Sequence, residues 1–183
     1  FVASSEYEIT RIIKNLPSTY SLHDPIPTLL LKKHYEYVVL HVSVIVNRSL
    51  ESSLYPESFK KAIIKPLLKK PSLDPDSFQN YRPVSNLKFQ SKVLERVVAI
   101  RLQAYLDHNS LTEPLQSAYR KFHSTESALV KVHNDILLSM DSKHSVFLVL
   151  LDLSAAFDTI DIDLLIHGFE MLGVEGSALS WIN

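Results

Sequence analysis

Apolar residues recur at the spacing of an α-helix in four parts of the chain. The pattern that begins near residue 5 ends at Pro17, and the pattern that begins at Asp161 ends at Gly173, both residues that stop helices. A third pattern opens with Ser124 and Thr125, either of which can cap a helix N-terminus. We therefore expect helices over residues 5–16, 89–108, 124–140 and 161–172.

Residues 28 to about 50 fit two interpretations. Apolar residues recur along this stretch at helical spacing, which predicts one long helix. The segment 37–46 is so rich in β-branched residues that a buried strand fits it as well. The pattern alone leaves both interpretations open.

Residues 60–87 hold two short apolar runs separated by a turn rich in proline, aspartate and serine. This pattern predicts a β-hairpin with a long tip. Pro66 and Pro83 fall within the two runs. Because proline has no N–H to donate, we expect these strands to be sheet edges or exposed flaps.

The run 146–151 consists of six apolar residues and is followed directly by Asp152. Its length and its content of valine and phenylalanine predict a β-strand with both faces covered. Together with the turn and helix expected after it, this strand would form an α/β element. The expected fold class is therefore α/β with a helical majority.

The composition is that of a globular protein and excludes several kinds of site. The 183 residues are 46% hydrophobic and contain no cysteine, which rules out disulfides, thiolate zinc sites and thiol nucleophiles. The sequence lacks both a membrane-length apolar stretch and a secretory leader, so we expect no membrane contact and a nuclear or cytoplasmic location. The net charge of −1 means that any polyanion must bind locally. Residues 60–70 are the densest basic segment, although a solvated surface also explains them.

Two interpretations fit the carboxylate of Asp152 at the end of an apolar run. It could cap the following turn by accepting hydrogen bonds from backbone N–H groups. It could also bind Mg²⁺, since strand ends in α/β folds face the ligand crevice. An aspartyl phosphatase would need a second acid where Ser154 stands, whereas a two-metal polymerase fits an acid followed five residues later by bulky Phe157.

Five segments, in order, resemble conserved blocks of one family. Residues 147–161, FLVLLDLSAAFDTID, resemble motif A of the reverse transcriptases and are most similar to those of LINE-type (non-LTR) retrotransposons. Residues 55–102, with YRP and SKVLER, and residues 115–129, LQSAYRKFHSTESAL, resemble the preceding blocks. Residues 21–32 and 168–183 match the flanking patterns.

The resemblance implies a partial right-hand polymerase fold, with fingers and an incomplete palm. Residues 1–59 would form an N-terminal helical region that leads into the fingers. Residues 60–143 would form the fingers, with the basic hairpin and helices. Residues 144–183 would form the start of the palm, which carries motif A.

The same resemblance implies roles for individual residues. Asp152 would be a catalytic Mg²⁺ ligand, and the backbone carbonyl of Leu153 a further ligand. Phe157 would act as a steric gate that favours deoxynucleotides, although plain core packing also explains it. The residues that would contact the incoming deoxynucleoside triphosphate are Lys69, Lys70 and Arg82; Arg82 could instead pair with Asp74 or Asp76.

Gln116, Tyr119 and Arg120 would line the template side, although an ordinary surface loop explains these residues equally well. The expected partners are an RNA template, a DNA primer and deoxynucleoside triphosphates. The family needs a second acidic motif with paired aspartates, and this sequence contains no Asp-Asp pair. We therefore predict that the 183-residue chain alone does not polymerise DNA, and that Mg²⁺ binds only when the palm is completed.

Three departures from the family pattern suggest a decaying or domesticated copy. Ala118 and Ser53 stand where the family has glycine, and Ile162 where it often has histidine. The alternative function is a non-catalytic remnant that binds nucleic acid or serves as an interaction module. Because motif A would lack its neighbouring strands, we also expect self-association through exposed strand edges.

Overall fold

The computed structural model describes the chain except for residues 20, 23, 154, 155 and 157. The chain divides into two compact units, residues 1–105 with 163–183, and residues 106–162, and each is described by itself. The helices are α1 (Glu6–Asn15), α2 (Thr28–Lys33), α3 (Tyr35–Ser52), α4 (Phe89–His108), α5 (Thr125–Asp141), α6 (Ile162–Met171) and α7 (Gly176–Ile182), and the strands are β1 (Ile63–Leu68) and β2 (Tyr81–Asn86).

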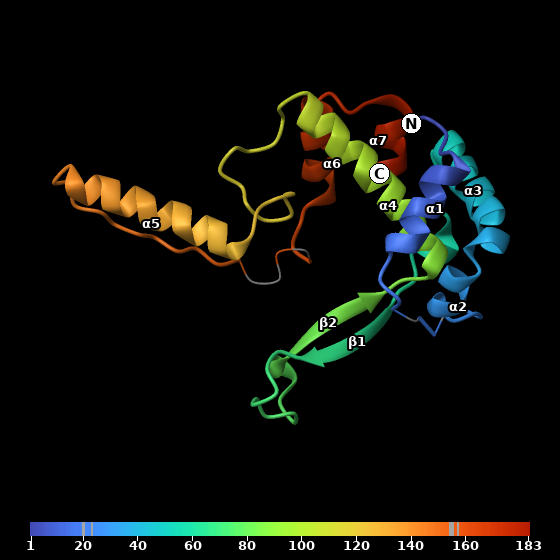
Figure 1. Ribbon diagram of the computed structural model, residues 1–183, viewed down its shortest axis with the longest axis horizontal. Coiled ribbons are helices and arrows are strands. Elements are labelled where there is room, and N and C mark those ends of the chain that lie inside the picture. Colours follow the sequence, from blue (N-terminus) through green and yellow to red (C-terminus); the bar gives the residue numbers. More distant parts are fainter. Residues whose placement is uncertain (20, 23, 154–155, 157) are drawn as a thin grey trace. The chain divides into compact units, whose positions relative to one another are not determined.

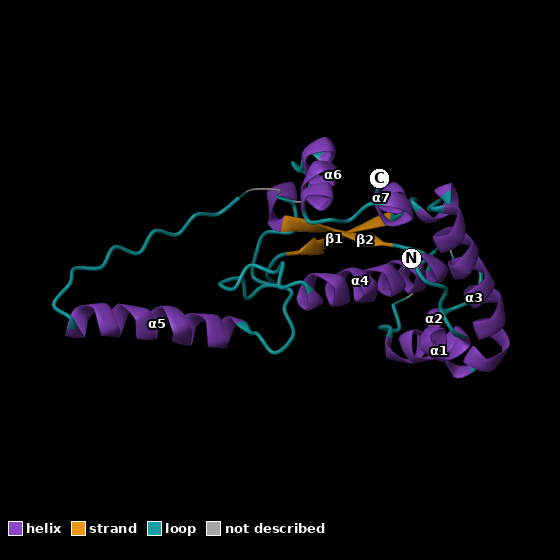
Figure 2. Ribbon diagram, turned by 90° about the horizontal axis from the view of Figure 1, so that it is seen from above, coloured by secondary structure: helices purple, strands orange, loops and turns teal. Residues whose placement is uncertain are grey.

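The core of the first unit lies among α1, α3 and the N-terminal half of α4. These helices gather side by side in both views (Figures 1 and 2). Each contributes an apolar face because its sequence repeats large apolar residues every three or four positions. The buried residues of this core include Ile9, Ile13, Val42, Val46, Phe89, Val93, Leu94 and Val97. The helices predicted over residues 5–16 and 89–108 are therefore confirmed.

Residues 28–50 form two helices, α2 and α3, and the strand interpretation is wrong. The helices meet at His34, which ends one and precedes the other. Val39, Val42 and Val46 are buried on the same face of α3. Their burial outweighs the weak preference of β-branched residues for strands, which is why local propensity misleads here.

The left-handed backbone at the C-terminal end of α3 falls on Ser53, where φ is 55° and ψ is 29°. The sequence has serine here, at a position where the resemblance implies glycine. A non-glycine residue in this conformation costs about 1–2 kcal/mol. The departure at Ser53 is therefore a local cost that the surrounding fold tolerates.

The predicted hairpin is confirmed and consists of β1 and β2, paired antiparallel. Pro66 lies opposite Pro83. Since neither has an N–H, this must be a pair whose backbone groups point away from the partner strand. The two prolines therefore interrupt no hydrogen bond between the strands. Among the described residues each strand pairs with the other alone, as expected for sheet edges. The hairpin projects from the helices of its unit (Figure 1).

The last two helices belong largely to the first unit. Gly173 follows α6 with a φ of +80°, and a Cβ there would lie 2.7 Å from the Tyr105 hydroxyl, so glycine is required. The predicted end of this helix is thus confirmed. Helix α7 was not predicted; Trp181 anchors it by donating a hydrogen bond of 3.0 Å from Nε1 to Ser49 Oγ.

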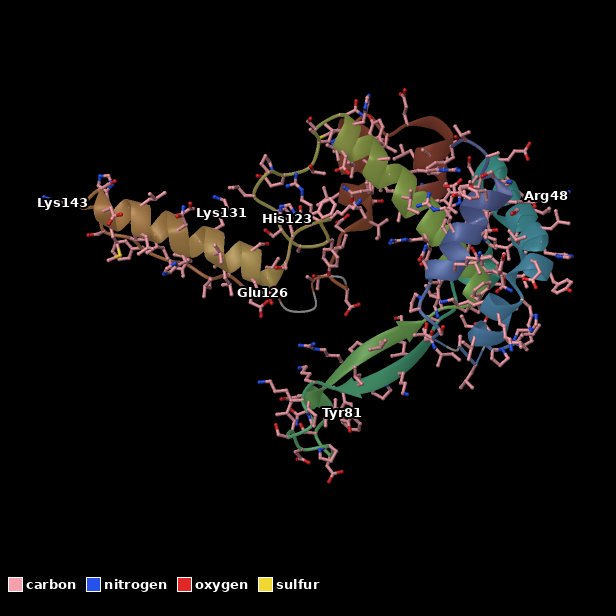
Figure 3. All side chains as sticks on the ribbon, viewed as in Figure 1. Arg48, Tyr81, His123, Glu126, Lys131 and Lys143 are labelled. Atoms are coloured by element: carbon pink, nitrogen blue, oxygen red, sulfur yellow. The ribbon has the colours of Figure 1, made fainter. Side chains whose placement is uncertain are left out.

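The second unit contains α5, which has the predicted bounds to within one residue. Ser124 and Ser127 form reciprocal side-chain to backbone hydrogen bonds at its N-terminus. The pKa of the Glu126 carboxyl, in the first turn, is lowered by hydrogen bonds from the Ser124 side chain and from the backbone N–H of Glu126. Lys131 and Asp135 form an exposed ion pair along the helix, at 3.0 Å. Figure 3 shows Lys131 on this helix. No residue of α5 is buried in the described part of the chain.

The strand predicted over residues 146–151 is wrong. Residues 144–153 have no regular secondary structure and are exposed, with Phe147 at 92% and Leu151 at 89%. A strand requires hydrogen bonds to a neighbour, and within the described residues this run has none. The helix-rich part of the fold class is confirmed, and the sheet of the described residues has two strands. No helix among these residues is long and apolar enough to cross a lipid bilayer.

Candidate functional site

The register of the hairpin brings its basic residues onto one face. Lys65 and Leu67 lie opposite Val84 and Arg82. Side chains directly opposite each other, and those two residues apart on one strand, share a face of the sheet. Lys69 is the next residue in this alternation, and its N–H donates to the Asn80 carbonyl at 2.8 Å, so the pairing extends to it. We call Lys65, Lys69 and Arg82 the basic face.

The charges of the basic face are exposed. The alternative in which Arg82 pairs with Asp74 or Asp76 is wrong, because no such ion pair exists between these described residues. Asp74 instead accepts the Asp76 N–H at 2.9 Å and shapes the hairpin tip. Lys69 Nζ donates to the Gln79 carbonyl at 2.7 Å, which satisfies one donor and leaves its charge uncompensated.

The tip of the hairpin is held by its own hydrogen bonds. Tyr81, which Figure 3 shows beside the tip, donates from its hydroxyl to the Pro75 carbonyl at 2.9 Å. Asn80 Nδ2 donates to the Asp74 carbonyl at 2.8 Å. These bonds explain how the Pro/Asp/Ser-rich turn keeps a defined shape. Lys70 follows the strand in this tip and is exposed.

The loop before α2, which contains Thr19 and Asp24, helps to attach the hairpin to α4. This attachment was not predicted from the sequence. Asp24 is 3% exposed, and both carboxylate oxygens accept the Phe89 N–H, at 3.0 and 3.1 Å. Lys92, one turn along α4, donates to Asn86 Oδ1 at the end of β2 at 2.8 Å and to Thr19 Oγ1 at 3.0 Å. Burial lowers the pKa of Lys92, partly offset by the charge of Asp24.

The other end of the hairpin is fixed by Tyr55, ahead of β1. Its hydroxyl lies 2.5 Å from Ser91 Oγ and donates to Glu95 Oε1 at 2.7 Å, so both contacts are to α4. Burial raises the pKa of Tyr55 above its ordinary value. The ring packs edge-on against Trp181, with centroids 5.4 Å apart. Both ends of the hairpin are therefore attached to the same helix.

Asp152 and Leu153 lie in the exposed run of the second unit. Phe157 lies outside the described residues. Asp152 could cap the backbone N–H groups of residues 154–157, and of these only residue 156 is described. A carboxylate and a backbone carbonyl are oxygen donors of the kind that Mg²⁺ prefers. No group of three or more His, Asp or Glu side chains placed to hold a metal exists among the residues described.

Gln116, Tyr119 and Arg120 lie in one loop of the second unit. Arg120 Nη1 donates to the carbonyls of Glu113 and Pro114, at 3.2 and 3.3 Å, and Gln116 Nε2 donates to the Ala118 carbonyl at 3.2 Å. The loop thus bends around its own polar side chains. Tyr119 has a φ of +61° and is 87% exposed.

The predicted residues fall in both units of the chain. The basic face and Lys70 belong to the first unit, and Asp152, Leu153 and the loop of Tyr119 belong to the second. Each group presents charge or an aromatic ring to solvent. The arrangement of the first group suits an anionic ligand, since guanidinium and ammonium groups bind phosphate oxygens.

Comparison with known proteins identifies the class. Residues 68–183 match the family described as "Reverse transcriptase (RNA-dependent DNA polymerase)". This match covers more than half of the chain, and the protein therefore belongs to the reverse transcriptase family.

Relatives from Drosophila melanogaster give a closer comparison. The chain is 32% identical over 140 residues to the "Probable RNA-directed DNA polymerase from transposon X-element", covering 75% of this chain and 15% of the relative. It is 31% identical over 154 residues to the "Probable RNA-directed DNA polymerase from transposon BS", covering 84% and 17%. The expected membership of the LINE-type (non-LTR) reverse transcriptases is confirmed.

A third relative, the "RNA-directed DNA polymerase from mobile element jockey" of the same organism, is 29% identical over 119 residues, covering 65% of this chain and 13% of the relative. The chain thus spans less than a fifth of the length of each of these relatives. The comparisons do not favour the alternative of a non-catalytic remnant.

Proposed function

We propose that this chain supplies the fingers and the first palm segment of an RNA-directed DNA polymerase. In this proposal residues 60–143 belong to the fingers and 144–183 to the palm, with residues 1–59 leading into the fingers. The partners are an RNA template, a DNA primer and deoxynucleoside triphosphates, and the protein works in the nucleus or cytoplasm. Family membership and the relatives' names support this assignment.

The basic face of the hairpin is the observation that carries the proposal. Lys65, Lys69 and Arg82 share one side of a two-stranded ribbon, and Arg82 has no acidic partner among the described residues. A triphosphate carries several negative charges, which a guanidinium can bind through two parallel hydrogen bonds and an ammonium as a point charge. We assign triphosphate binding to Lys69, Lys70 and Arg82.

We assign the metal-binding role to Asp152 and the Leu153 carbonyl. A bound Mg²⁺ would neutralise charge that develops on the transferring phosphate. These two donors do not complete a site, and the sequence has no Asp-Asp pair to supply the rest. The polymerase therefore needs a second acidic segment from outside these 183 residues. Phe157 would exclude a ribose 2′-hydroxyl by its bulk.

The loop of Gln116, Tyr119 and Arg120 is assigned to the template. The exposed ring of Tyr119 can stack on a base of any identity. Arg120 holds two backbone carbonyls, which suits a residue that shapes the loop as well as one that contacts phosphate. Its substitution should therefore affect both loop order and template binding.

A chimaera tests the proposal. Residues 68–183 replace the matched segment of a full-length relative, and primer extension is measured on an RNA template with Mg²⁺. We expect extension, and Asp152→Asn should lower its rate by about a thousandfold or more, because catalytic groups that act as a unit lose most of the rate together. Arg82→Gln should raise the KM for the triphosphate, and Phe157→Ala should raise ribonucleotide incorporation.

Asp163→Asn is the matched control, because Asp163 is an exposed acid in the first turn of α6. This substitution should leave the extension rate unchanged. Equal activity of the Asp152→Asn and Asp163→Asn chimaeras would contradict the metal-binding role. Extension by the 183-residue chain alone would contradict the requirement for a second acidic segment.

A further inference from the structure

A groove of about 610 Å³ lies between α1 and α4, within the first unit. Tyr7 and Arg11 line it from α1, and Arg96 and Ile100 line it from α4. Within each pair the residues are four positions apart, which places them on one face of their helix. The groove therefore runs along two helices that the core already holds together.

The groove carries a net positive charge. Arg11 and Arg96 are exposed and form no ion pair within the described part of the chain. Glu8 also lines the groove, but its carboxylate is paired with Arg101 at 3.3 Å. Arg101 is further occupied by Val2 and Ser4, to which it donates hydrogen bonds. Two guanidinium groups thus remain available from opposite walls.

The remaining lining suits a ligand with a flat apolar part. Ile12 and Ile100 give the groove apolar walls, and Tyr7 presents a ring that is 73% exposed. Guanidinium groups bind phosphate, and a tyrosine ring stacks on a nucleobase whatever its identity. We propose that this groove binds single-stranded nucleic acid, with phosphates on Arg11 and Arg96 and a base on Tyr7.

This site goes beyond the proposed polymerase function. Its residues lie on α1 and α4, none of them belongs to the basic hairpin, and Tyr7 and Arg11 precede the segment matched by the family. A strand held here would be bound in addition to one at the template loop. An acidic peptide is the competing occupant, because it also carries negative charge but offers no base for Tyr7.

The test measures binding of a fluorescent oligouridylate of about ten nucleotides to the full chain by anisotropy. All variants carry Lys65→Gln, Lys69→Gln, Lys70→Gln and Arg82→Gln, so that these cations of the hairpin do not contribute to binding and failure of the proposed function does not affect the result. Adding Arg11→Gln and Arg96→Gln should weaken binding about tenfold or more. It should also reduce the slope of log affinity against log salt by about 1.4, because each of the two phosphates that the arginines neutralise contributes about 0.7.

Tyr7→Ala should weaken binding about fivefold or more without changing the salt slope, because stacking is not ionic. The matched control is Lys33→Gln with Arg48→Gln, which removes two exposed charges from α2 and α3 of the same unit (Figure 3 shows Arg48). An oligonucleotide with 4-thiouridine, cross-linked by light and mapped by mass spectrometry, should attach to the peptide that contains Tyr7. Circular dichroism verifies that each variant is folded.

Three outcomes would overturn the proposal. The control pair could weaken binding as much as the groove pair, which would show diffuse attraction to charge. Cross-links could be confined to residues outside α1 and α4. Finally, an oligoglutamate of equal charge could bind the groove more tightly than the oligonucleotide, which would assign the groove to an acidic protein segment.

Discussion

Asp24→Ala should destabilise the first unit by about 2–3 kcal/mol. The substitution removes a charged acceptor from the Phe89 N–H at the start of α4, where both groups are buried. A hydrogen bond to a charged group contributes about 1.5–3 kcal/mol. The carboxylate also gains about 0.3–1 kcal/mol from its position at a helix N-terminus. The cost of burying its charge offsets part of the total, which gives the expected value of about 2–3 kcal/mol.

The free energy of unfolding is measured by urea denaturation followed by far-UV circular dichroism. Asp24→Asn keeps a neutral acceptor and should cost about half as much as the alanine substitution. Hydrogen exchange at the Phe89 amide should accelerate in Asp24→Ala. The matched control is Asp76→Ala, which removes an exposed acid from the hairpin tip and should change stability by less than about 0.5 kcal/mol. Equal effects of Asp24→Ala and Asp76→Ala would refute the capping role.

Four further substitutions test other local features by urea unfolding. Ser53→Gly should stabilise the chain by about 1 kcal/mol, because glycine adopts the left-handed conformation without a Cβ penalty; a loss of stability would contradict this. Gly173→Ala should destabilise the chain by more than about 1 kcal/mol, because it adds backbone strain and a clash with the Tyr105 hydroxyl. Gly168→Ala, within α6, should stabilise the chain by about 1 kcal/mol, because nothing lies close to the added Cβ and alanine favours the helix. Tyr55→Phe should cost about 1 kcal/mol at neutral pH. The pKa of Tyr55 is raised in the folded state, so the stabilisation that its neutral hydroxyl provides is complete below the unfolded pKa of 10.0 and is lost as pH rises above it. The free energy of unfolding of Tyr55→Phe should therefore fall less steeply than that of the unsubstituted chain between about pH 9 and 11.

The helices could be predicted from the sequence where one apolar face recurs locally. The patterns of α1, α4 and α5 predicted their bounds to within a residue or two. The break at His34 has no such signal, because neither glycine nor proline marks it. The strand expected at 146–151 failed for a different reason, since a strand depends on a partner that local sequence does not reveal.

The candidate site was predictable to a similar extent. The two apolar runs and their turn predicted the hairpin, and its alternation then places Lys65, Lys69 and Arg82 on one face. The attachment of that hairpin was not predictable, because Asp24 and Phe89 are 65 positions apart in the sequence. Contacts between such distant residues leave no periodic pattern in either segment.

The Pro66–Pro83 pair has a consequence for how the hairpin meets other molecules. The backbone nitrogens of Pro66 and Pro83, which carry no hydrogen, point away from each other toward the two outer edges of the hairpin, at the same level. A foreign strand that docked alongside would find no donor there on either flank, so sheet growth is discouraged. The proline pair thus disfavours edge-to-edge pairing of the hairpin and leaves its cationic side accessible. The exposed run 146–151 contains no proline, so we expect any self-association to begin there.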